Sequence, residues 1–304
     1  ALVFSDESLL RSQPRKPARG WRRVVYTLTG GKVSPAPSPE ELEHLRLIER
    51  VRNPVGGCRR IAVISRKGGV GKTTTTLMLG HTFALHRGDR IVALDGNPDA
   101  GSLGYRVPRE TQATVTDLLD RAGALERYAD VRGLTSQATT RLEVVASDDD
   151  PHISQAIGEH EYREAVTLLE RHYNLILLDS GTGILDSATQ GILRVADQLV
   201  VVMAPSIDGS RAAGLTLDWL DSHGYGGMVR GAVAVINQSR ERGSLVEVHR
   251  IEDHFRSRCR DVALIPWDPH LEAGAQSDPD QLRPQTRDAY LRLAASVADG
   301  FTAR

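Results

Sequence analysis

The stretch SRKGGVGKTT, at residues 65–74, combines the residue types that bind a chain of phosphates. Glycines let successive backbone N–H groups turn toward one anion, and a helix that follows adds the positive end of its dipole. A strand-like run, this loop and a helical run come in that order between residues 60 and 86. The sequence therefore predicts a phosphate-binding loop. Its expected phosphate ligands are Gly68, Gly69, Val70, Gly71, Lys72, Thr73 and Thr74.

Three side chains at the end of this loop have separate predicted roles. Lys72 would contact the β- and γ-phosphates, the Thr73 hydroxyl would bind Mg²⁺, and Thr74 would donate to the α-phosphate. The strict string G-x-x-x-x-G-K-[ST] is not met, because Arg66 stands at the first glycine position. The strand, loop and helix context still favours a nucleotide site over an ordinary glycine-rich turn.

A carboxylate for the metal is expected in NLILLDSGTG, residues 174–183. Asp179 ends an apolar run, and the carboxyl ends of parallel strands open onto the crevice where ligands bind in such sheets. A carboxylate placed there can hold a Mg²⁺-bound water beside the phosphates. Gly181 and Gly183 follow directly and leave room for a γ-phosphate. The pattern predicts that Asp179 serves the metal.

A phosphate loop does not require the lysine at position 67. This residue is the basis of a resemblance to a known family. The string K-G-G-x-G-K-T-T resembles the deviant Walker A loop of the MinD/ParA ATPase superfamily. The resemblance implies a homodimer that sandwiches ATP, in which Lys67 of each subunit reaches the phosphates held by the other. A cation supplied in this way would make nucleotide occupancy and dimerisation depend on each other.

The segment RIVALDGNPDAGSL, residues 90–103, corresponds to the first switch segment of that family, usually of the D-x-D-P type. By this resemblance Asp95 is a ligand of magnesium-bound water, and Asn97 replaces the aspartate that orients the attacking water. Asparagine can hydrogen-bond that water but is a poor proton acceptor. We therefore expect ATP binding with weak hydrolysis. The sequence leaves open whether Asn97 is natural or was introduced to trap the bound state, and whether Asp99 substitutes for it.

Two later strand ends are expected to bind the base. In the superfamily, an asparagine after one strand and the loop after the next strand hold adenine, which corresponds here to Asn237 and to Pro266 with Asp268. The carboxamide of Asn237 has the donor and the acceptor that the N6/N7 edge of adenine requires. The sequence contains no guanine-reading N-K-x-D string, which favours ATP over GTP. ATP and Mg²⁺ are therefore the expected cofactors.

From Arg60 onward, short Val/Ile/Leu runs alternate with helical stretches. The runs are almost continuously apolar, which is typical of parallel strands that helices cover on both faces. The sequence predicts a doubly wound, mostly parallel α/β sheet flanked by helices, residues 58–304, preceded by a basic extension, residues 1–57, with one short helix. The expected strands are 60–65, 90–95, 142–146, 174–179, 198–204, 232–237 and 262–266. The expected helices are 72–86, 159–171, 187–195, 209–222, 245–256 and 285–300.

Composition excludes several other classes of protein. The net charge is −1, but residues 1–60 hold twelve Lys/Arg and six Asp/Glu, so a basic arm precedes an acidic body. Cys58 and Cys259 are far apart, which argues against a metal cluster and fits a reducing, cytoplasmic location. No 18-residue apolar run occurs, so no membrane insertion is expected. The chain begins at Ala1 rather than methionine, which indicates a piece trimmed from a longer protein.

Several phrases narrow the resemblance further. The strings RGWRR, ERVRNPVG, SIDGSRAAGLTLDWL and IPWDPHLEAG resemble the EspI-type ATPases encoded in mycobacterial ESX (type VII) secretion loci. This resemblance implies a protein partner in a secretion apparatus and recruitment to a membrane-bound complex. Nucleic-acid binding of the ParA type is an alternative, which rests on a basic stretch that contains Arg240, Arg242, Arg250, Arg256, Arg258 and Arg260. It is less favoured, because such a stretch is usually a solvated helical face. MinD-like membrane cycling is disfavoured, because the alanine-rich C-terminal helix is expected to pack on the domain.

Overall fold

The computed structural model describes residues 38–97, 101–240 and 247–301. By its internal contacts the chain divides into two units, residues 1–46 and 47–304, and helix α3 (Pro39–Val51) runs across the division. In the first unit the backbone N–H of Glu41 donates to Ser38 Oγ at 3.1 Å, which caps the start of α3. The basic arm with its tryptophan, Trp21, lies outside the described residues.

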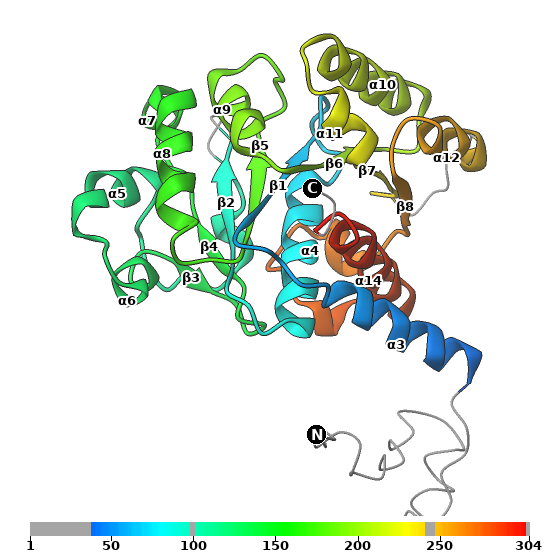
Figure 1. The fold of residues 1–304 in the computed structure, drawn as a ribbon, viewed down its shortest axis with the longest axis horizontal. Helices are drawn as coiled ribbons and strands as arrows, with labels where there is room; N and C mark the ends of the chain where they lie inside the picture. Colours follow the sequence, from blue (N-terminus) through cyan, green and yellow to red (C-terminus); the bar gives the residue numbers. More distant parts are fainter. Residues whose placement is uncertain (1–37, 98–100, 241–246, 302–304) are drawn as a thin grey trace, which may run out of the picture. The chain divides into compact units, whose positions relative to one another are not determined.

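The second unit contains one eight-stranded sheet, in the order β3-β4-β2-β5-β1-β6-β7-β8 (Figure 1). All neighbouring strands pair in parallel except β3, which is antiparallel to β4. The strands are β1 (Arg59–Ile64), β2 (Ile91–Gly96), β3 (Ser136–Gln137), β4 (Glu143–Val145), β5 (Leu175–Ser180), β6 (Gln198–Met203), β7 (Val233–Asn237) and β8 (Asp261–Ile265). The fold class predicted from the sequence is confirmed.

Helices cover both faces of this sheet and bury two separate apolar cores. Successive side chains of β1 point to opposite faces of the sheet. Ala62 and Ile64 belong to one core, and Ile61 and Val63 belong to the other. One face carries α4 (Lys72–His86) and α14 (Pro284–Ala298), which lie side by side in Figure 1. The other carries α8 (Glu159–Leu169), α9 (Ser187–Val195), α10 (Ile207–Ser222), α11 (Gly226–Gly231) and α12 (Val248–Arg256).

The elements missed by sequence pattern are short. They are β3 and the helices α5 (Val115–Asp120), α6 (Tyr128–Arg132), α7 (Pro151–Ala156), α11 and α13 (Pro269–Glu272), besides the 3₁₀ turns η1 (Gly104–Arg106), η2 (Ala122–Ala124) and η3 (Pro279–Gln281). None of them is long enough to repeat an apolar period twice, so the pattern carries no signal for them. The longer predicted elements agree with the structure within three residues at each end.

The C-terminal helix packs on the domain, as its composition predicts. Leu291, Leu293 and Val297 of α14 are buried in the same core as α4. Among the described helices, none combines the length and apolarity needed to cross a bilayer.

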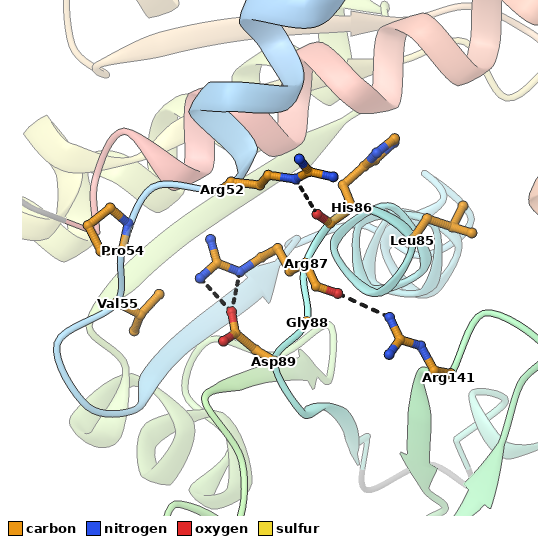
Figure 2. Close-up of a pocket in the computed structure, with 9 residues that line it drawn as sticks. All are labelled: Arg52, Pro54, Val55, Leu85, His86, Arg87, Gly88, Asp89 and Arg141. Atoms are coloured by element: carbon orange, nitrogen blue, oxygen red, sulfur yellow. Dashed lines mark hydrogen bonds and ion pairs between the residues drawn. The ribbon is translucent and has the colours of Figure 1, made fainter. Parts of the chain in front are cut away.

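The far end of α4 is held by arginines, around a pocket of about 630 Å³ (Figure 2). Arg52 Nε donates to the His86 carbonyl at 2.8 Å, and Arg141 Nη2 donates to the Arg87 carbonyl at 3.1 Å. The buried Arg87 guanidinium bonds Asp89 and the carbonyls of Val51 and Asn53. These cations satisfy carbonyls at the negative end of a helix dipole. The pocket therefore belongs to the scaffold that fixes α4, whose other end is the phosphate loop.

Packing extends the second unit beyond the predicted domain start at residue 58. Leu47 and Val51 of α3 are 4% and 0% exposed and belong to the core between α4 and α14. Arg50 also pairs with Asp299, with an Nη2–Oδ2 distance of 2.7 Å. The start of the phosphate-binding domain at residue 58 stays a prediction.

Candidate nucleotide site

The phosphate loop lies between β1 and α4, at the carboxyl edge of the sheet. Gly69 and Gly71 have φ angles of +74° and +88°, in the left-handed region that favours glycine. Gly71 is the N-cap of α4, and Lys72 begins the helix. The amino end of α4 is thus directed at the loop, which is the geometry that binds anions through backbone N–H groups. The structure places all the predicted phosphate ligands, residues 68–74, in this loop and the first turn of α4.

Asp179 is the penultimate residue of β5, beside this loop, and is fully buried. Lys72 Nζ lies 2.9 Å from Asp179 Oδ1, and the Thr73 hydroxyl donates to Oδ2 at 2.6 Å. The hydroxyl of Thr76, one helical turn further on, donates to Oδ1 at 3.0 Å. The carboxylate is therefore fixed by one cation and two hydroxyls. Sequence reasoning found the first three residues and missed Thr76, although its spacing of three from Thr73 places both on one helix face.

Asp95 is the penultimate residue of β2, directly across from Asp179 in the parallel register. Its buried carboxylate accepts the backbone N–H groups of Asn97 at 3.2 Å and Leu103 at 3.0 Å. Burial and, next, the facing charge of Asp179 raise the pKa of Asp95. A Cβ atom added to Gly101 would lie 2.0 Å from Asp95 Oδ2, so the chain can fold around this carboxylate only with glycine there.

The residues present fit Mg²⁺. The ion is typically held by one or two carboxylates together with substrate phosphates and water, all through oxygen. Thr73 and Asp179 present such oxygens beside the phosphate loop, with Asp95 on the neighbouring strand. Within the described ranges no cluster of three acidic, histidine or cysteine residues suited to a metal is present.

Two further residues have predicted catalytic roles: Asn97, in the segment after β2, and Lys67, in the phosphate loop. Asn97 follows β2, and Asp99, its suggested substitute, lies outside the described residues. The ammonium of Lys67 is half-exposed and lies 3.9 Å from Asp208 Oδ2, at the start of α10 of the same chain. The roles of Lys67 toward a second subunit and of Asn97 toward water stay predictions.

A pocket of about 200 Å³ opens from the phosphate loop toward the ends of β7 and β8. All three residues predicted to bind the base, Asn237, Pro266 and Asp268, line it. Residues from four separate stretches of the chain meet there: Gly69, Gly71, Thr74, Arg106, Asn237, Gln238, Ser239, Pro266, Trp267, Asp268, Leu271, Glu272 and Gly274. The sheet order brings β7 and β8 onto the same side of β1, which is why these distant segments share one pocket.

Two of the predicted base residues also hold the loops in place. Asn237 Nδ2 donates to the Val70 carbonyl at 2.8 Å and so fixes the phosphate loop. Asp268 accepts the backbone N–H of His270 at 3.0 Å and of Arg283 at 2.9 Å. Both Asp268 oxygens thus cap and shape the loop after β8, which the sequence did not indicate.

Trp267 and Arg106 line the pocket and were missed as site residues. The indole Nε1 of Trp267 donates to Glu272 Oε2 at 2.7 Å, and the Arg283 guanidinium lies 4.8 Å from the ring centre. A tryptophan directly after an apolar strand, where ligands bind, was the available signal. Arg106 carried no such signal, because its position depends on how the segment after β2 folds back.

Residues 58–213, just over half of the chain, match the protein family described as "AAA domain". The chain belongs to this family of MinD/ParA-like P-loop ATPases. The roles of the loop at residues 65–74 in phosphate binding and of Asp179 in metal binding stay predictions.

Individual relatives agree with this assignment. The ESX-1 secretion-associated protein EspI of Mycobacterium tuberculosis is 38% identical over 285 residues, which are 93% of this chain and 42% of EspI. The chain thus spans less than half the length of that relative. A ParA family ATPase from Chlorobium tepidum shares the fold with a TM-score of 0.65 and 19% identity, covering 78% of this chain and 98% of that one. MinD of Pyrococcus horikoshii, complexed with Mg-ADP, has a TM-score of 0.61 and 22% identity, covering 78% and 94%.

The basic stretch of this P-loop ATPase is partly tied to its own fold. Arg258 pairs with Asp218 at 2.6 Å and with Asp221 at 2.7 Å, both on α10. Arg260 Nη2 donates to the Ser296 carbonyl of α14 at 2.6 Å. Arg242 lies outside the described residues. Arginines that are already engaged by carboxylates and carbonyls contribute less to phosphate binding, so Arg258 and Arg260 are poor candidates for a nucleic-acid site.

Proposed function

We propose that this chain is an ATP-switched regulator: it binds MgATP, pairs two copies around the nucleotide and hydrolyses it slowly. The proposal rests on one observation: the predicted phosphate site and the predicted base pocket adjoin each other at the same loop. The buried cluster of Lys72, Thr73 and Asp179 lies at the base of the Walker A loop, and the pocket of Asn237 and Trp267 begins at the same loop. A phosphate chain with an attached base spans two such sites.

In this mechanism the residues of the chain divide the work. The backbone of the phosphate loop and Lys72 would bind the phosphates, and Thr73 and Asp179 would hold a magnesium ion, which would neutralise phosphate charge. Asp95 fixes the switch segment through its bonds to Asn97 and Leu103. Asn97 would orient water without accepting its proton, so hydrolysis would be slow.

Measuring ATP turnover of the full chain beside Asn97→Asp tests the catalytic part. We expect the aspartate variant to be at least about tenfold faster, since a positioned general base contributes about 10²–10⁴-fold. Asn97→Ala is the matched control and should not be faster. Equal turnover by the chain and Asn97→Asp would show that position 97 does not set the rate.

The dimer rests on Lys67. Its contact with Asp208 is long and largely exposed, with 49% and 77% of the two side chains accessible, so it costs little to break. The lysine is thus available to phosphates held by a second copy. Sedimentation with ADP, with ATP and with Lys67→Ala tests this: ATP-dependent dimerisation should disappear in the variant. A monomer under every condition would remove the dimeric switch from the proposal.

We assign the biological role to type VII secretion, through a protein partner at a membrane-bound secretion complex on its cytoplasmic side. The identity to EspI, whose name associates it with ESX-1 secretion, supports this role. Replacing Lys72 by alanine in the organism that encodes the chain, and measuring export of type VII substrates, tests it. Unchanged export would count against a regulatory role in secretion.

A further inference from the structure

Arg106 lies beside the candidate nucleotide site, in a segment that was not predicted to contact phosphate. It ends the 3₁₀ turn η1, after the switch segment, and its carbonyl accepts the backbone N–H of Ser277 at 2.8 Å. Its Nη1 donates to Thr74 Oγ1, at the end of the Walker A loop, with a distance of 2.9 Å. The side chain therefore crosses from η1 to the phosphate-binding turn, and it lines the pocket between that turn and the loop after β8.

The electrostatic setting of this guanidinium is unusual. It is half-buried, and none of the described carboxylates lies within ion-pair distance of it. Its partner in the site is the neutral hydroxyl of Thr74. Burial lowers the pKa of Arg106, while the charge of Asp179 acts in the opposite direction. An arginine keeps its charge under such conditions, so a partly desolvated cation faces the pocket beside an anion-binding turn.

In the hydrogen bond between Arg106 and Thr74, the guanidinium is the donor and the hydroxyl oxygen is the acceptor. The hydroxyl proton is therefore directed to another acceptor. In a Walker A loop the residue at this position donates to the α-phosphate. A nucleotide bound by the turn would thus bring its α-phosphate to both Thr74 and the neighbouring guanidinium.

We propose that Arg106 is a ligand of the α-phosphate, and that it contributes equally to the affinity for ATP and to the affinity for ADP. The proposal rests on the proposed nucleotide binding and adds a residue to it. Because ATP and ADP share the α-phosphate, the loss of Arg106 should weaken both equally. Lys72, which is directed to the β- and γ-phosphates, should instead change the ratio of the two affinities.

Calorimetric titration of the full chain with MgADP and with a non-hydrolysable MgATP analogue tests this. A charge-assisted hydrogen bond predicts that Arg106→Gln binds both about 10- to 100-fold more weakly, with their affinity ratio unchanged. Arg106→Lys keeps the charge and should recover part of the loss. Arg109→Gln is the matched control: Arg109 lies in the same segment, pairs with Asp149 at 3.5 Å and does not line the pocket.

A second readout separates phosphate contact from support of the loop. ADP with one non-bridging α-phosphate oxygen replaced by sulfur accepts hydrogen bonds poorly at that atom. The unaltered chain should bind at least one of the two α-thio diastereomers more weakly than ADP, and Arg106→Gln should lose that discrimination. If Arg106→Gln binds like the unaltered chain, or weakens ADP and both analogues by the same factor, Arg106 is not a phosphate ligand. If the unaltered chain binds no nucleotide, the proposed function itself fails.

Discussion

The ammonium of Lys72 lies 2.9 Å from Asp179 Oδ1, and the two side chains are only 8% and 0% exposed. The pair joins the start of α4 to β5 in the interior of the fold. Removal of one member of such a pair leaves an uncompensated buried charge, which is expensive in free energy. The same two residues therefore affect both nucleotide binding and folding.

Lys72→Met should lose nucleotide binding and lower the free energy of unfolding by about 3 kcal/mol. Thr73 and Thr76 still donate to Asp179 in the variant, which keeps the loss at the lower end for a broken buried pair. Urea unfolding and ADP titration measure the two effects. Lys67→Met, the half-exposed lysine of the same loop, should change stability by less than about 0.5 kcal/mol. Two variants that unfold alike would contradict the buried pair.

Gly71→Ala should also remove nucleotide binding, for a steric reason. Position 71 has a φ of +88°, and an added Cβ atom would lie 2.1 Å from Asn237 Nδ2. The loop would have to release the bond from Asn237 to the Val70 carbonyl. We expect a loss of stability of at least about 1 kcal/mol, measured by thermal and urea unfolding.

The matched control for that variant is Gly214→Ala in α10. Nothing lies within 4 Å of a Cβ atom there, so the change should stabilise the helix by about 1 kcal/mol. A stabilised Gly71→Ala variant would show that the loop is not strained by an added methyl group.

Stability should fall at acidic pH because of His81. This residue of α4 is 1% exposed and lies against Thr140, with Nδ1 and Oγ1 2.7 Å apart. Burial lowers the pKa of His81 to about 4, from an ordinary value of 6.5. The unfolded chain therefore binds the proton first. The free energy of unfolding that the neutral, buried His81 contributes is fully present above pH about 6.5. It is lost as the pH falls toward about 4, by up to about 3 kcal/mol.

Urea unfolding of the chain and of His81→Leu between pH 4 and pH 7.5 measures this dependence. The leucine variant should show a shallower loss of stability over that window, because its buried side chain cannot bind a proton. Parallel curves for the two proteins would assign the acid sensitivity to other groups.

DNA retention on filters should be weak and should not depend on ATP. Arg258 and Arg260 are engaged by carboxylates and a carbonyl of the same chain, so these two cations of the basic stretch are less available to phosphates. The measurement is made with and without ATP at two salt concentrations. Retention that requires ATP and falls steeply with salt would favour a partition protein instead.

The phosphate half of the site could be predicted from the sequence because its signals are local. Lys72, Thr73 and Thr74 follow a strand and begin a helix, and Asp179 ends an apolar run, so type and spacing were sufficient. The base half was predicted by resemblance alone, and the capping role of Asp268 was not predicted. Thr76 and Trp267 were missed although helix spacing and a strand end signalled them. Arg106 could not be predicted, because its position depends on how the segment after β2 folds back and no local period encodes that.

The sequence by itself determined the alternation of strands and helices, since continuously apolar runs require helices on both faces. It also determined the turn at residues 68–71, which needs glycine for its backbone angles. Only the tertiary structure decided that Asp95 faces Asp179, that Asn237 holds the Val70 carbonyl, and that Arg106 reaches Thr74. The physical reason is that these contacts join segments 30 or more residues apart, whose proximity follows from the sheet order and from buried packing.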